Sequence, residues 1–231
     1  MQAEVQLELQ LHGDSMKSLL VIIILSYICG SFPTSIILGK LIKNIDIRNY
    51  GSGNAGGTNA FRVLGWQWGI LVSIVDILKG VIATLVISQI RIDTLPFDSV
   101  MLIRIIAGLS AIVGHTFTIF AGFKGGKGVA TGAGVLISLY PFVFLLCVLI
   151  FALVLFSTGI VSVSSMVTSI CFPLLVLIIS YLKHQSPDTY LLTFSILIPI
   201  FIIFTHRTNI QKLLKGEEHV FDKIAILKKK K

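Results

Sequence analysis

The sequence predicts an all-α, polytopic integral membrane protein: a helical bundle with seven transmembrane helices, an N-terminus outside the cell and a C-terminus in the cytoplasm. Three observations lead to this fold class. First, 55% of the 231 residues are hydrophobic, only 13% are charged and the mean hydropathy is +0.92, which excludes a soluble domain with a polar surface. Second, apolar runs recur at about the 20-residue length that a membrane-crossing helix needs. Third, lysine and arginine gather in particular linkers and at the C-terminal end.

Five apolar runs are candidates for single crossings, namely residues 19–42, 69–90, 100–121, 160–182 and 191–205. A further apolar stretch, residues 129–157, is longer than one crossing needs and contains Tyr140-Pro141 near its middle. Proline interrupts helices because it lacks an amide hydrogen and restricts the residue before it. This stretch is therefore predicted to form two short crossings.

Charge sets the predicted orientation, because lysine and arginine concentrate in cytoplasmic loops whereas acidic residues count for little. The tail after residue 205 is strongly basic, and the linkers that contain Arg48, Arg62, Lys124 and Lys127 are also basic. The N-terminal segment and residues 91–99 contain more acidic than basic residues. With the N-terminus outside, a cytoplasmic tail requires seven crossings. Reading residues 129–157 as one long crossing gives six and leaves the basic tail outside.

The chain is interpreted as one domain with two short ends. Met16-Lys17, followed by an apolar run, resembles a natural start of the folded chain, so residues 1–15 are expected to be a disordered extension. A cleaved signal peptide fits less well, because no soluble domain follows. Residues 16–221 form the predicted membrane domain, and residues 222–231 a basic tail that contacts the membrane. The three cysteines lie in apolar runs without metal-ligand spacing, so they are interpreted as buried small hydrophobes, and no metal is predicted.

The first polar segment is a glycine-rich cluster at residues 51–59. Glycines allow backbone N–H groups to approach an anion, and neighbouring hydroxyls, amides and arginines add donors and charge. The candidate anion-binding residues are Arg48, Ser52, Gly53, Asn54, Thr58, Asn59 and Arg62. A generic flexible loop is the alternative, but it would rarely place two asparagines between arginines. A dinucleotide-binding loop is excluded because its βαβ context is missing.

The second polar segment, residues 124–131, contains Gly125, Gly126, Lys127 and Gly128 directly before an apolar run. A helix N-terminus at this position would present free N–H groups and a positive dipole to a phosphate. The segment lacks the spacing of a Walker A loop, which argues against ATP hydrolysis. The charge rule alone would explain the lysine but not the three glycines.

Several further polar residues do not suit a lipid environment. Asp76 and Lys79 lie three residues apart on one predicted helix, where they can pair, and His115 lies on the next helix as either a satisfied buried imidazole or a supporting hydrogen-bond partner. Ser162 begins a later helix, where serine is usually a cap. The last group is His206, Arg207 and Asn209 with Glu218 nearby; a lipid-headgroup patch is the competing explanation.

These groups share one predicted membrane face, which favours a phosphorylated substrate and a lipid product. The cluster Gly51–Asn59, the Gly-Gly-Lys-Gly-Val-Ala-Thr segment at 125–131, Asp76-x-x-Lys79-Gly80, Gly114-His115 and His206-Arg207-x-Asn209 resemble the bacterial glycerol-3-phosphate acyltransferases that use acyl phosphate as donor. The resemblance implies a seven-helix enzyme of the bacterial cell membrane with its active site facing the cytoplasm. It implies acyl transfer from acyl phosphate to the 1-hydroxyl of glycerol 3-phosphate, giving lysophosphatidic acid and phosphate.

The resemblance also implies roles for individual residues. Ser52, Lys127, His206 and Asn209 match the catalytic positions. The substrate-binding positions are Arg48, Ser52, Gly53, Asn54, Thr58, Asn59, Arg62, Gly125, Gly126, Gly128, Ser162 and Arg207. Supporting roles fall to Asp76, Lys79, His115 and Glu218. The implied enzyme is a monomer that needs no cofactor, metal or acyl-enzyme intermediate. It binds the two substrates and membrane lipid but no nucleic acid. The base in the implied reaction is a phosphate oxygen of the donor or His206.

Three departures from the family pattern are visible. Gly57 stands where alanine is usual, the residues around Ser162 differ from the usual motif, and a lysine-rich tail follows Phe221. No histidine precedes an aspartate at the His-x-x-x-x-Asp spacing, which argues against a coenzyme A thioester as donor. The alternative function is a transporter of a phosphorylated solute, but such proteins typically show internal repeats and polar residues near the membrane midplane. Neither is apparent in this sequence.

Overall fold

The computed structural model describes residues 16–96, 98–221 and 225. Within these residues every regular element is an α-helix or a short 3-10 helix. The predicted extension at residues 1–15 and all of the predicted basic tail except residue 225 lie outside the described residues. The all-helical fold class is confirmed for the part of the chain that is described.

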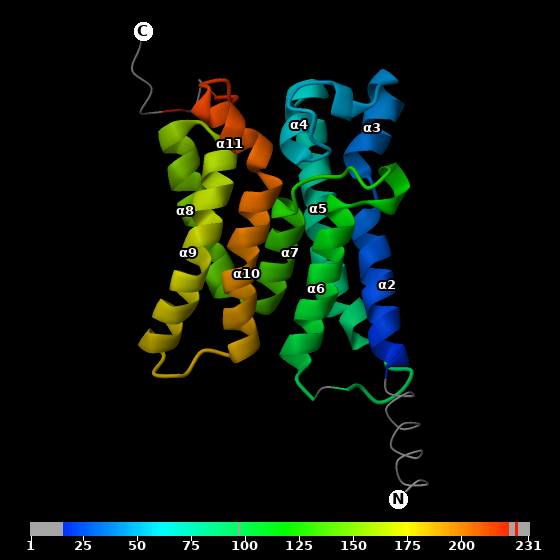
Figure 1. Ribbon diagram of the computed structural model, residues 1–231, viewed down its shortest axis with the longest axis vertical. Coiled ribbons are helices and arrows are strands. Elements are labelled where there is room, and N and C mark those ends of the chain that lie inside the picture. The colour runs from blue at the N-terminus through cyan, green and yellow to red at the C-terminus, as the bar shows by residue number, and fades with distance from the viewer. Residues whose placement is uncertain (1–15, 97, 222–224, 226–231) are drawn as a thin grey trace, which may run out of the picture.

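The helices follow the predicted apolar runs closely (Figure 1). The α-helices are α2 (Lys17–Ser31), α3 (Thr34–Lys43), α4 (Gly57–Val63), α5 (Trp66–Leu85), α6 (Val100–Thr116), α7 (Val129–Leu139), α8 (Pro141–Thr158), α9 (Val161–Leu182), α10 (Thr189–Thr205) and α11 (Arg207–Leu214). The 3-10 helices are η1 (Ile47–Asn49), η2 (Ile87–Gln89) and η3 (Ile119–Ala121). The break between α2 and α3 falls at Pro33, whose ring cannot continue the helical hydrogen bonding.

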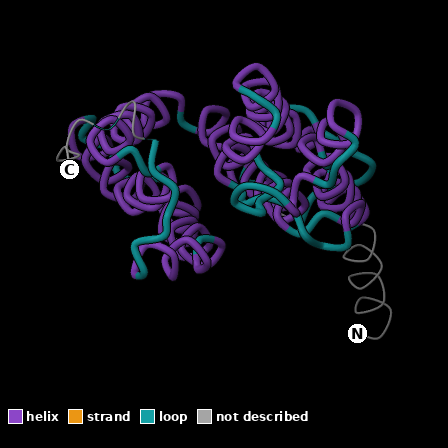
Figure 2. Tube along the Cα trace, turned by 90° about the horizontal axis from the view of Figure 1, so that it is seen from above, coloured by secondary structure: helices purple, strands orange, loops and turns teal. Residues whose placement is uncertain are grey.

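The helices form two groups that lie side by side (Figures 1 and 2). One group contains α2, α5 and α6, with α3 and α4 at one end of it. The other contains α8, α9 and α10, continued by α11. Helix α7 packs against α5 and α6 of the first group and against α8 of the second. It therefore connects the two groups, and the loop before it lies where both groups can contribute residues.

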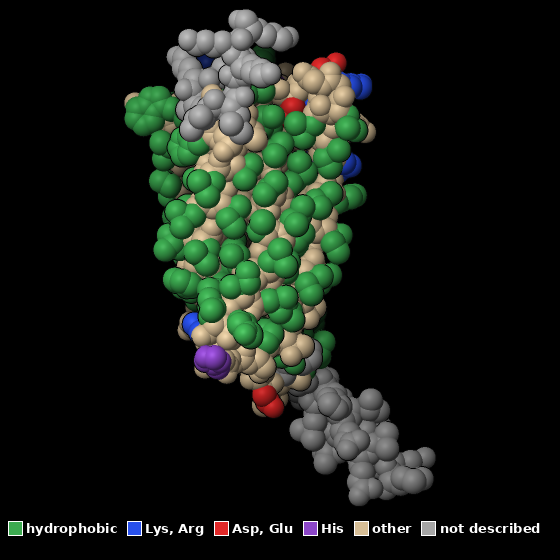
Figure 3. Space-filling model, turned by 90° about the vertical axis from the view of Figure 1, so that its left-hand side faces the viewer, with side chains coloured by type: hydrophobic (Ala, Val, Ile, Leu, Met, Phe, Trp, Pro, Cys, Tyr) green, Lys and Arg blue, Asp and Glu red, His purple; other side chains and the backbone are tan. Residues whose placement is uncertain are grey.

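The outer surface is suited to lipid. Five helical segments in the described part of the chain are long and apolar enough to cross a membrane, or six if the bent pair of α10 and α11 counts as one. Figure 3 shows hydrophobic side chains covering the face formed by the second group, with charged side chains toward its ends. Large apolar side chains are exposed along most of the long helices, as expected where hydrocarbon replaces water as the solvent. The chain is a multi-pass membrane protein.

The predicted interruption at Tyr140-Pro141 is confirmed, but the two parts are unequal. Helix α7 has 11 residues, fewer than a full crossing of the hydrocarbon core requires. Helix α8 has 18 residues, with Pro141 in its first turn, where a missing amide hydrogen costs nothing.

Glycines allow the helices around α7 to pack closely. A Cβ added at Gly134 of α7 would overlap the carbonyl oxygen of Ile77 in α5, and one at Gly80 of α5 would overlap the carbonyl oxygen of Thr131 in α7. Small residues at such contacts are the usual means of packing helices in membranes, where lipid gives no hydrophobic driving force between them. This contact fixes the start of α7 relative to α5.

Candidate active site

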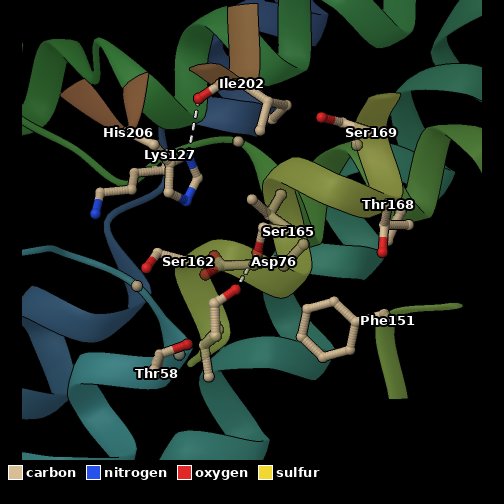
Figure 4. A pocket seen from close by; sticks show the side chains of 18 of the residues that line it. Thr58, Asp76, Lys127, Phe151, Ser162, Ser165, Thr168, Ser169, Ile202 and His206 are labelled. Carbon is tan, nitrogen blue, oxygen red and sulfur yellow. Dashed lines mark hydrogen bonds between the residues drawn. The ribbon is translucent and has the colours of Figure 1, made fainter. Parts of the chain in front are cut away.

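A cavity of about 450 Å³ lies between the two groups of helices. Its wall includes most of the predicted site residues: Ser52, Asn54, Thr58, Arg62, Asp76, His115, Lys127, Gly128, Ser162, His206, Asn209 and Glu218. In Figure 4, Thr58, Lys127 and Ser162 lie toward one side of the cavity, while Phe151 and Thr168 lie toward the other. Residues up to 166 positions apart in the sequence, from Ser52 to Glu218, thus meet at one pocket.

Asn59 holds the first glycine loop in shape. Its side-chain Oδ1 accepts a hydrogen bond from the N–H of Ser52 at 2.8 Å. Its Nδ2 donates to the carbonyl oxygens of Ile47 and Tyr50 at 3.1 and 3.0 Å. Gly51 has a φ of 62°, and a Cβ there would overlap Asn59 Oδ1. The sequence predicts substrate contact for Asn59, but the fully buried amide is used inside the loop and does not line the cavity; Gly53 does not line it either.

The second glycine loop is held by the end of α6. Gly126 N–H donates to the carbonyl oxygen of His115, and Gly125 N–H donates to that of Thr116, both at 3.0 Å. The N–H groups of Gly125 and Gly126 therefore already have partners and are not free for an anion, and the substrate-binding role of these two glycines stays a prediction. Gly128 and the first turn of α7 do line the cavity. No side chain caps this helix, so its first amide groups have no intrahelical acceptor.

Arg48 fastens the other end of the same loop. Its Nη1 donates to the carbonyl oxygens of Ala121 at 2.7 Å and Lys124 at 3.3 Å, and its Nη2 lies 2.7 Å from the Asp46 carboxylate. Arg48 is absent from the cavity wall. Predicted as a substrate-binding residue, Arg48 instead joins the two glycine loops to each other.

Lys127 begins a chain of polar contacts across the cavity. Its Nζ donates to Asn209 Oδ1, and Asn209 Nδ2 donates to Glu218 Oε1 at 2.7 Å. Ser162 Oγ donates to the same Glu218 oxygen at 3.0 Å. Thr205 Oγ1 also donates to the Lys127 carbonyl at 3.1 Å. The second glycine loop is thereby connected to the ends of α9, α10 and α11.

The cationic side chains of the site are partly buried. Burial lowers the pKa of Lys127 to about 8, and the nearby Glu218 carboxylate opposes this shift. Burial also lowers the pKa of Arg62, again opposed by Glu218. The Arg62 guanidinium lies 5.0 Å from the ring centroid of Phe221, in the range of a cation–π contact. Two cations, Lys127 and Arg62, and two carboxylates, Glu218 and Asp76, thus line one cavity. Because Asp76 is already paired with Lys79, Glu218 is the carboxylate left to balance the two cations, and the remaining positive charge suits a phosphorylated ligand.

Arg207 does not face this cavity. Its guanidinium donates to the Phe204 carbonyl oxygen at 3.1 Å and lies 4.8 Å from the centroid of the Phe204 ring, on the exposed side of the helix. The adjacent His206 is buried and lines the cavity. The substrate contact predicted for Arg207 has no support in this geometry.

The apolar part of the cavity was not predicted from the sequence. It extends among α6, α7, α8, α9 and α10 and is lined by Phe144, Cys147, Phe151, Phe172, Phe194, Ile198 and Ile202. Ser165 and Ser169 follow Ser162 along the same wall of α9, and this serine spacing is the one signal that could have indicated the direction of the cavity. A pocket with a cationic end and an apolar arm can hold a molecule with an anionic head and a hydrocarbon chain.

The described residues contain no group of three or more His, Cys, Asp and Glu side chains that could hold a metal ion. Cys29, Cys147 and Cys171 are free thiols. Cys147 is buried, as the sequence predicts, but it lies on the cavity wall.

Comparisons with known proteins identify the family of the chain. The chain matches the family glycerol-3-phosphate acyltransferase over residues 20–216. A protein named glycerol-3-phosphate acyltransferase from Chlorobium chlorochromatii (strain CaD3) is 46% identical, over 88% of this chain and 97% of that protein. The relative of the same name from Pelodictyon phaeoclathratiforme (strain DSM 5477 / BU-1) is also 46% identical, over 88% and 96%.

The fold has a solved counterpart. The crystal structure of PlsY (YgiH), an integral membrane glycerol 3-phosphate acyltransferase, in its glycerol 3-phosphate form has a TM-score of 0.78 and 35% sequence identity, covering 88% of this chain and 96% of that one. Its lysophosphatidic acid form has a TM-score of 0.75 and 34% identity, covering 88% and 95%. Sequence, fold and cavity agree, and the chain belongs to the glycerol-3-phosphate acyltransferase family.

Proposed function

We propose that the protein transfers a fatty acyl group from acyl phosphate to the 1-hydroxyl of glycerol 3-phosphate, forming lysophosphatidic acid and phosphate. The observation that carries this proposal is the single cavity with a cationic polar end and an apolar arm. Membership of the acyltransferase family supports the acceptor and the reaction. The glycerol 3-phosphate and lysophosphatidic acid forms of PlsY support the acceptor and product. Acyl phosphate is the donor that the sequence motifs imply.

The polar end of the cavity offers separate donors for two phosphate groups. Lys127, Arg62 and Ser52 are proposed to bind glycerol 3-phosphate, with His206 and Asn209 completing that side. Asn54, Ser162, Gly128 and the free amide groups at the start of α7 are proposed to face the donor phosphate, because a helix N-terminus favours an anion. The acyl chain occupies the apolar arm along α9.

The reaction needs orientation and charge stabilisation, because an acyl phosphate is already activated. The 1-hydroxyl oxygen of glycerol 3-phosphate attacks the acyl carbonyl carbon. The bond between this carbon and the bridging oxygen breaks, and phosphate leaves with the electron pair. The hydroxyl proton passes to a phosphate oxygen, so lysophosphatidic acid and inorganic phosphate are the products. Lys127 stabilises the negative charge on the phosphate groups.

The geometry around His206 favours the donor phosphate as base. His206 Nδ1 lies 2.8 Å from the Ile202 carbonyl oxygen, an acceptor only, so Nδ1 carries the hydrogen and Nε2 is the free acceptor. Taking up a proton at Nε2 would place a third cation in the buried site that already holds Lys127 and Arg62. A neutral His206 that orients the acceptor hydroxyl avoids this cost.

We propose a single membrane domain of residues 16–221 in the bacterial cell membrane, acting as a monomer, with the N-terminus outside and the site facing the cytoplasm. We propose seven crossings, which counts as one short crossing the 11-residue helix α7 that packs against α5, α6 and α8. Helix α4, which carries Arg62, lies at the same end of the bundle as α3 and α11 (Figure 1), and the lysines and arginines of these helices support a cytoplasmic location for this end. In sealed inverted vesicles, added glycerol 3-phosphate should be acylated directly. Sealed right-side-out vesicles should need permeabilisation first; the opposite result would reverse the orientation.

The donor is tested with purified protein in detergent, glycerol 3-phosphate, and either palmitoyl phosphate or palmitoyl coenzyme A, in the presence of a metal chelator. We expect lysophosphatidic acid from palmitoyl phosphate alone. Product from the coenzyme A thioester alone would overturn the proposed donor. No product from either donor, with intact protein, would favour transport, and uptake of glycerol 3-phosphate into vesicles would then be measured.

The pKa of Lys127 leads to a prediction about pH. With a pKa of about 8, the ammonium group is present below that pH and is lost above it. We expect kcat/KM for glycerol 3-phosphate to fall about tenfold per pH unit above about 8, because kcat/KM reports groups of the free enzyme. Initial rates are measured from about pH 6 to about pH 9.5 after subtracting donor hydrolysis.

The matched variant for this pH profile is Lys127→Arg. Arginine keeps its charge throughout the range, so this variant should lose the alkaline decline even if its maximum rate is lower. An unchanged decline in the variant would assign the titration to another group.

A further inference from the structure

Helices α2, α5 and α6 enclose a buried ionic cluster that the proposed chemistry does not use. Asp76, Lys79 and His115 are 2%, 4% and 7% exposed. Lys79 Nζ donates to Asp76 Oδ1 at 2.5 Å, and His115 Nδ1 lies 3.6 Å from the same oxygen. Lys79 also donates to the Phe32 carbonyl oxygen at 2.5 Å, and Thr34 Oγ1 lies 3.5 Å from Asp76 Oδ1. Charges at membrane depth are costly, and an apolar pair of similar volume would fill the same space.

One side of this cluster supports the second glycine loop. The His115 carbonyl accepts from Gly126 N–H and the Thr116 carbonyl from Gly125 N–H. The His115 ring lies directly beneath Gly126: a Cβ added there would overlap Nε2, Cε1 and Cδ2 of the imidazole. Gly126 directly precedes Lys127 in the chain. The position of the imidazole ring therefore determines the position of the backbone from which the Lys127 side chain extends.

We propose that His115 is a positioning residue for Lys127, and that the Asp76–Lys79 pair holds the imidazole in the orientation this requires. The inference rests on the proposed function. Asp76 lies next to Nδ1, so the opposite edge of the ring, with Nε2, is turned to Gly126. Lys79 fixes the carboxylate through Phe32, at the end of α2. Arg48 holds the first half of the loop through Ala121 and Lys124, and His115 holds the second half.

The pair His115 and Gly126 is tested by a double-mutant cycle. Gly126→Ala should lower kcat/KM for glycerol 3-phosphate about a hundredfold, because a displacement of about 1 Å at a catalytic group costs that much. His115→Ala should lower it about tenfold to a hundredfold. In the double variant the added methyl occupies the space that the ring has left, so activity should equal that of His115→Ala alone. Additive losses would overturn the proposal.

A second comparison separates positioning from simple stabilisation of the fold. Asp76→Leu combined with Lys79→Met replaces the ion pair by apolar side chains. We expect this variant to retain the thermal stability of the unmodified protein in detergent but to lose about tenfold or more in kcat, because the imidazole is no longer oriented. If this variant keeps both the stability and the activity of the unmodified protein, the ion pair only fills space in the fold and does not orient the imidazole. Thr84→Val, a buried change two turns along α5, is the control and should change neither.

The unmodified chain is assayed first with glycerol 3-phosphate and both acyl donors. Inactivity of this chain rejects the proposed function, whereas activity with an additive cycle rejects only the role of His115. If the Gly126→Ala variant does not fold, the double variant is compared with His115→Ala instead. The proposal requires that the double variant folds and has the same kcat/KM as His115→Ala. A double variant that does not fold, or that has a lower kcat/KM, overturns the proposal.

Discussion

Replacing Lys127 by alanine is expected to lower kcat/KM for glycerol 3-phosphate about a thousandfold, the cost typical of removing one charge-stabilising group from an enclosed site. Lys127 lies on the cavity wall, contacts Asn209 and precedes the start of α7 at Val129 by two residues. The loss should appear in kcat and kcat/KM, because with the proposed acyl phosphate donor the charge is needed most when phosphate leaves. Initial rates with palmitoyl phosphate measure it.

Lys124→Ala is the matched control for this variant. Lys124 lies in the same loop and is followed by glycine as Lys127 is, but it is exposed and does not line the cavity. It should change kcat/KM less than about threefold, within the range of an exposed charge. Similar losses in both variants would mean that the loop contributes only general positive charge. Unchanged thermal unfolding in detergent shows that each variant is folded.

Replacing Gly134 by valine is expected to destabilise the folded protein by about 3 kcal/mol, at the upper end of the usual cost of overpacking. A Cβ at this position would overlap the backbone of Ile77 and crowd Val81 in α5, and backbone atoms of a packed helix cannot move aside as a side chain can. The midpoint of thermal unfolding in detergent measures the effect. Activity should fall with the folded fraction, since this contact fixes the start of α7.

Gly132→Val is the control for this packing prediction. Gly132 lies two residues earlier in α7, and the nearest atom to a Cβ there is Ile112 Cδ1 at 3.8 Å, an ordinary contact distance. Both variants place a β-branched residue in the same helix, so the cost in helix propensity is shared. Equal destabilisation would show that propensity, and not contact with α5, determines the result. Only stability is compared, because Gly132 lines the cavity.

Local chemistry explains which features could be predicted from the sequence. Tyr140-Pro141 marked the break between α7 and α8, because the effect of proline on a helix depends on its own backbone. The residue types of the polar end were recognisable for a similar reason. Polar side chains such as Ser52, Lys127 and Asn209 are costly in a chain that is otherwise apolar, so their presence indicates a binding or catalytic role.

Features that depend on packing could not be predicted. Asn59 has the residue type of an anion-binding side chain, but its amide points into its own loop. Gly125 and Gly126 have the composition of a phosphate loop, yet α6 occupies their N–H groups. The apolar arm is formed by phenylalanines from separate helices, and Phe172 and Phe194 meet edge to face with centroids 6.0 Å apart. Nothing in either helix alone distinguishes such a side chain from one that faces lipid.

The carboxylate of Glu218 has a consequence for each turnover of the enzyme. It accepts hydrogen bonds from Asn209 and Ser162 at the cationic end of the cavity, so the empty site already contains an anion. A phosphate that binds therefore takes over the role of counter-ion that the Glu218 carboxylate has in the empty site. When the phosphate leaves, the carboxylate again balances the charges of Lys127 and Arg62. Product release therefore does not leave Lys127 and Arg62 without a nearby anion, which lowers the free energy needed to empty the site before the next cycle.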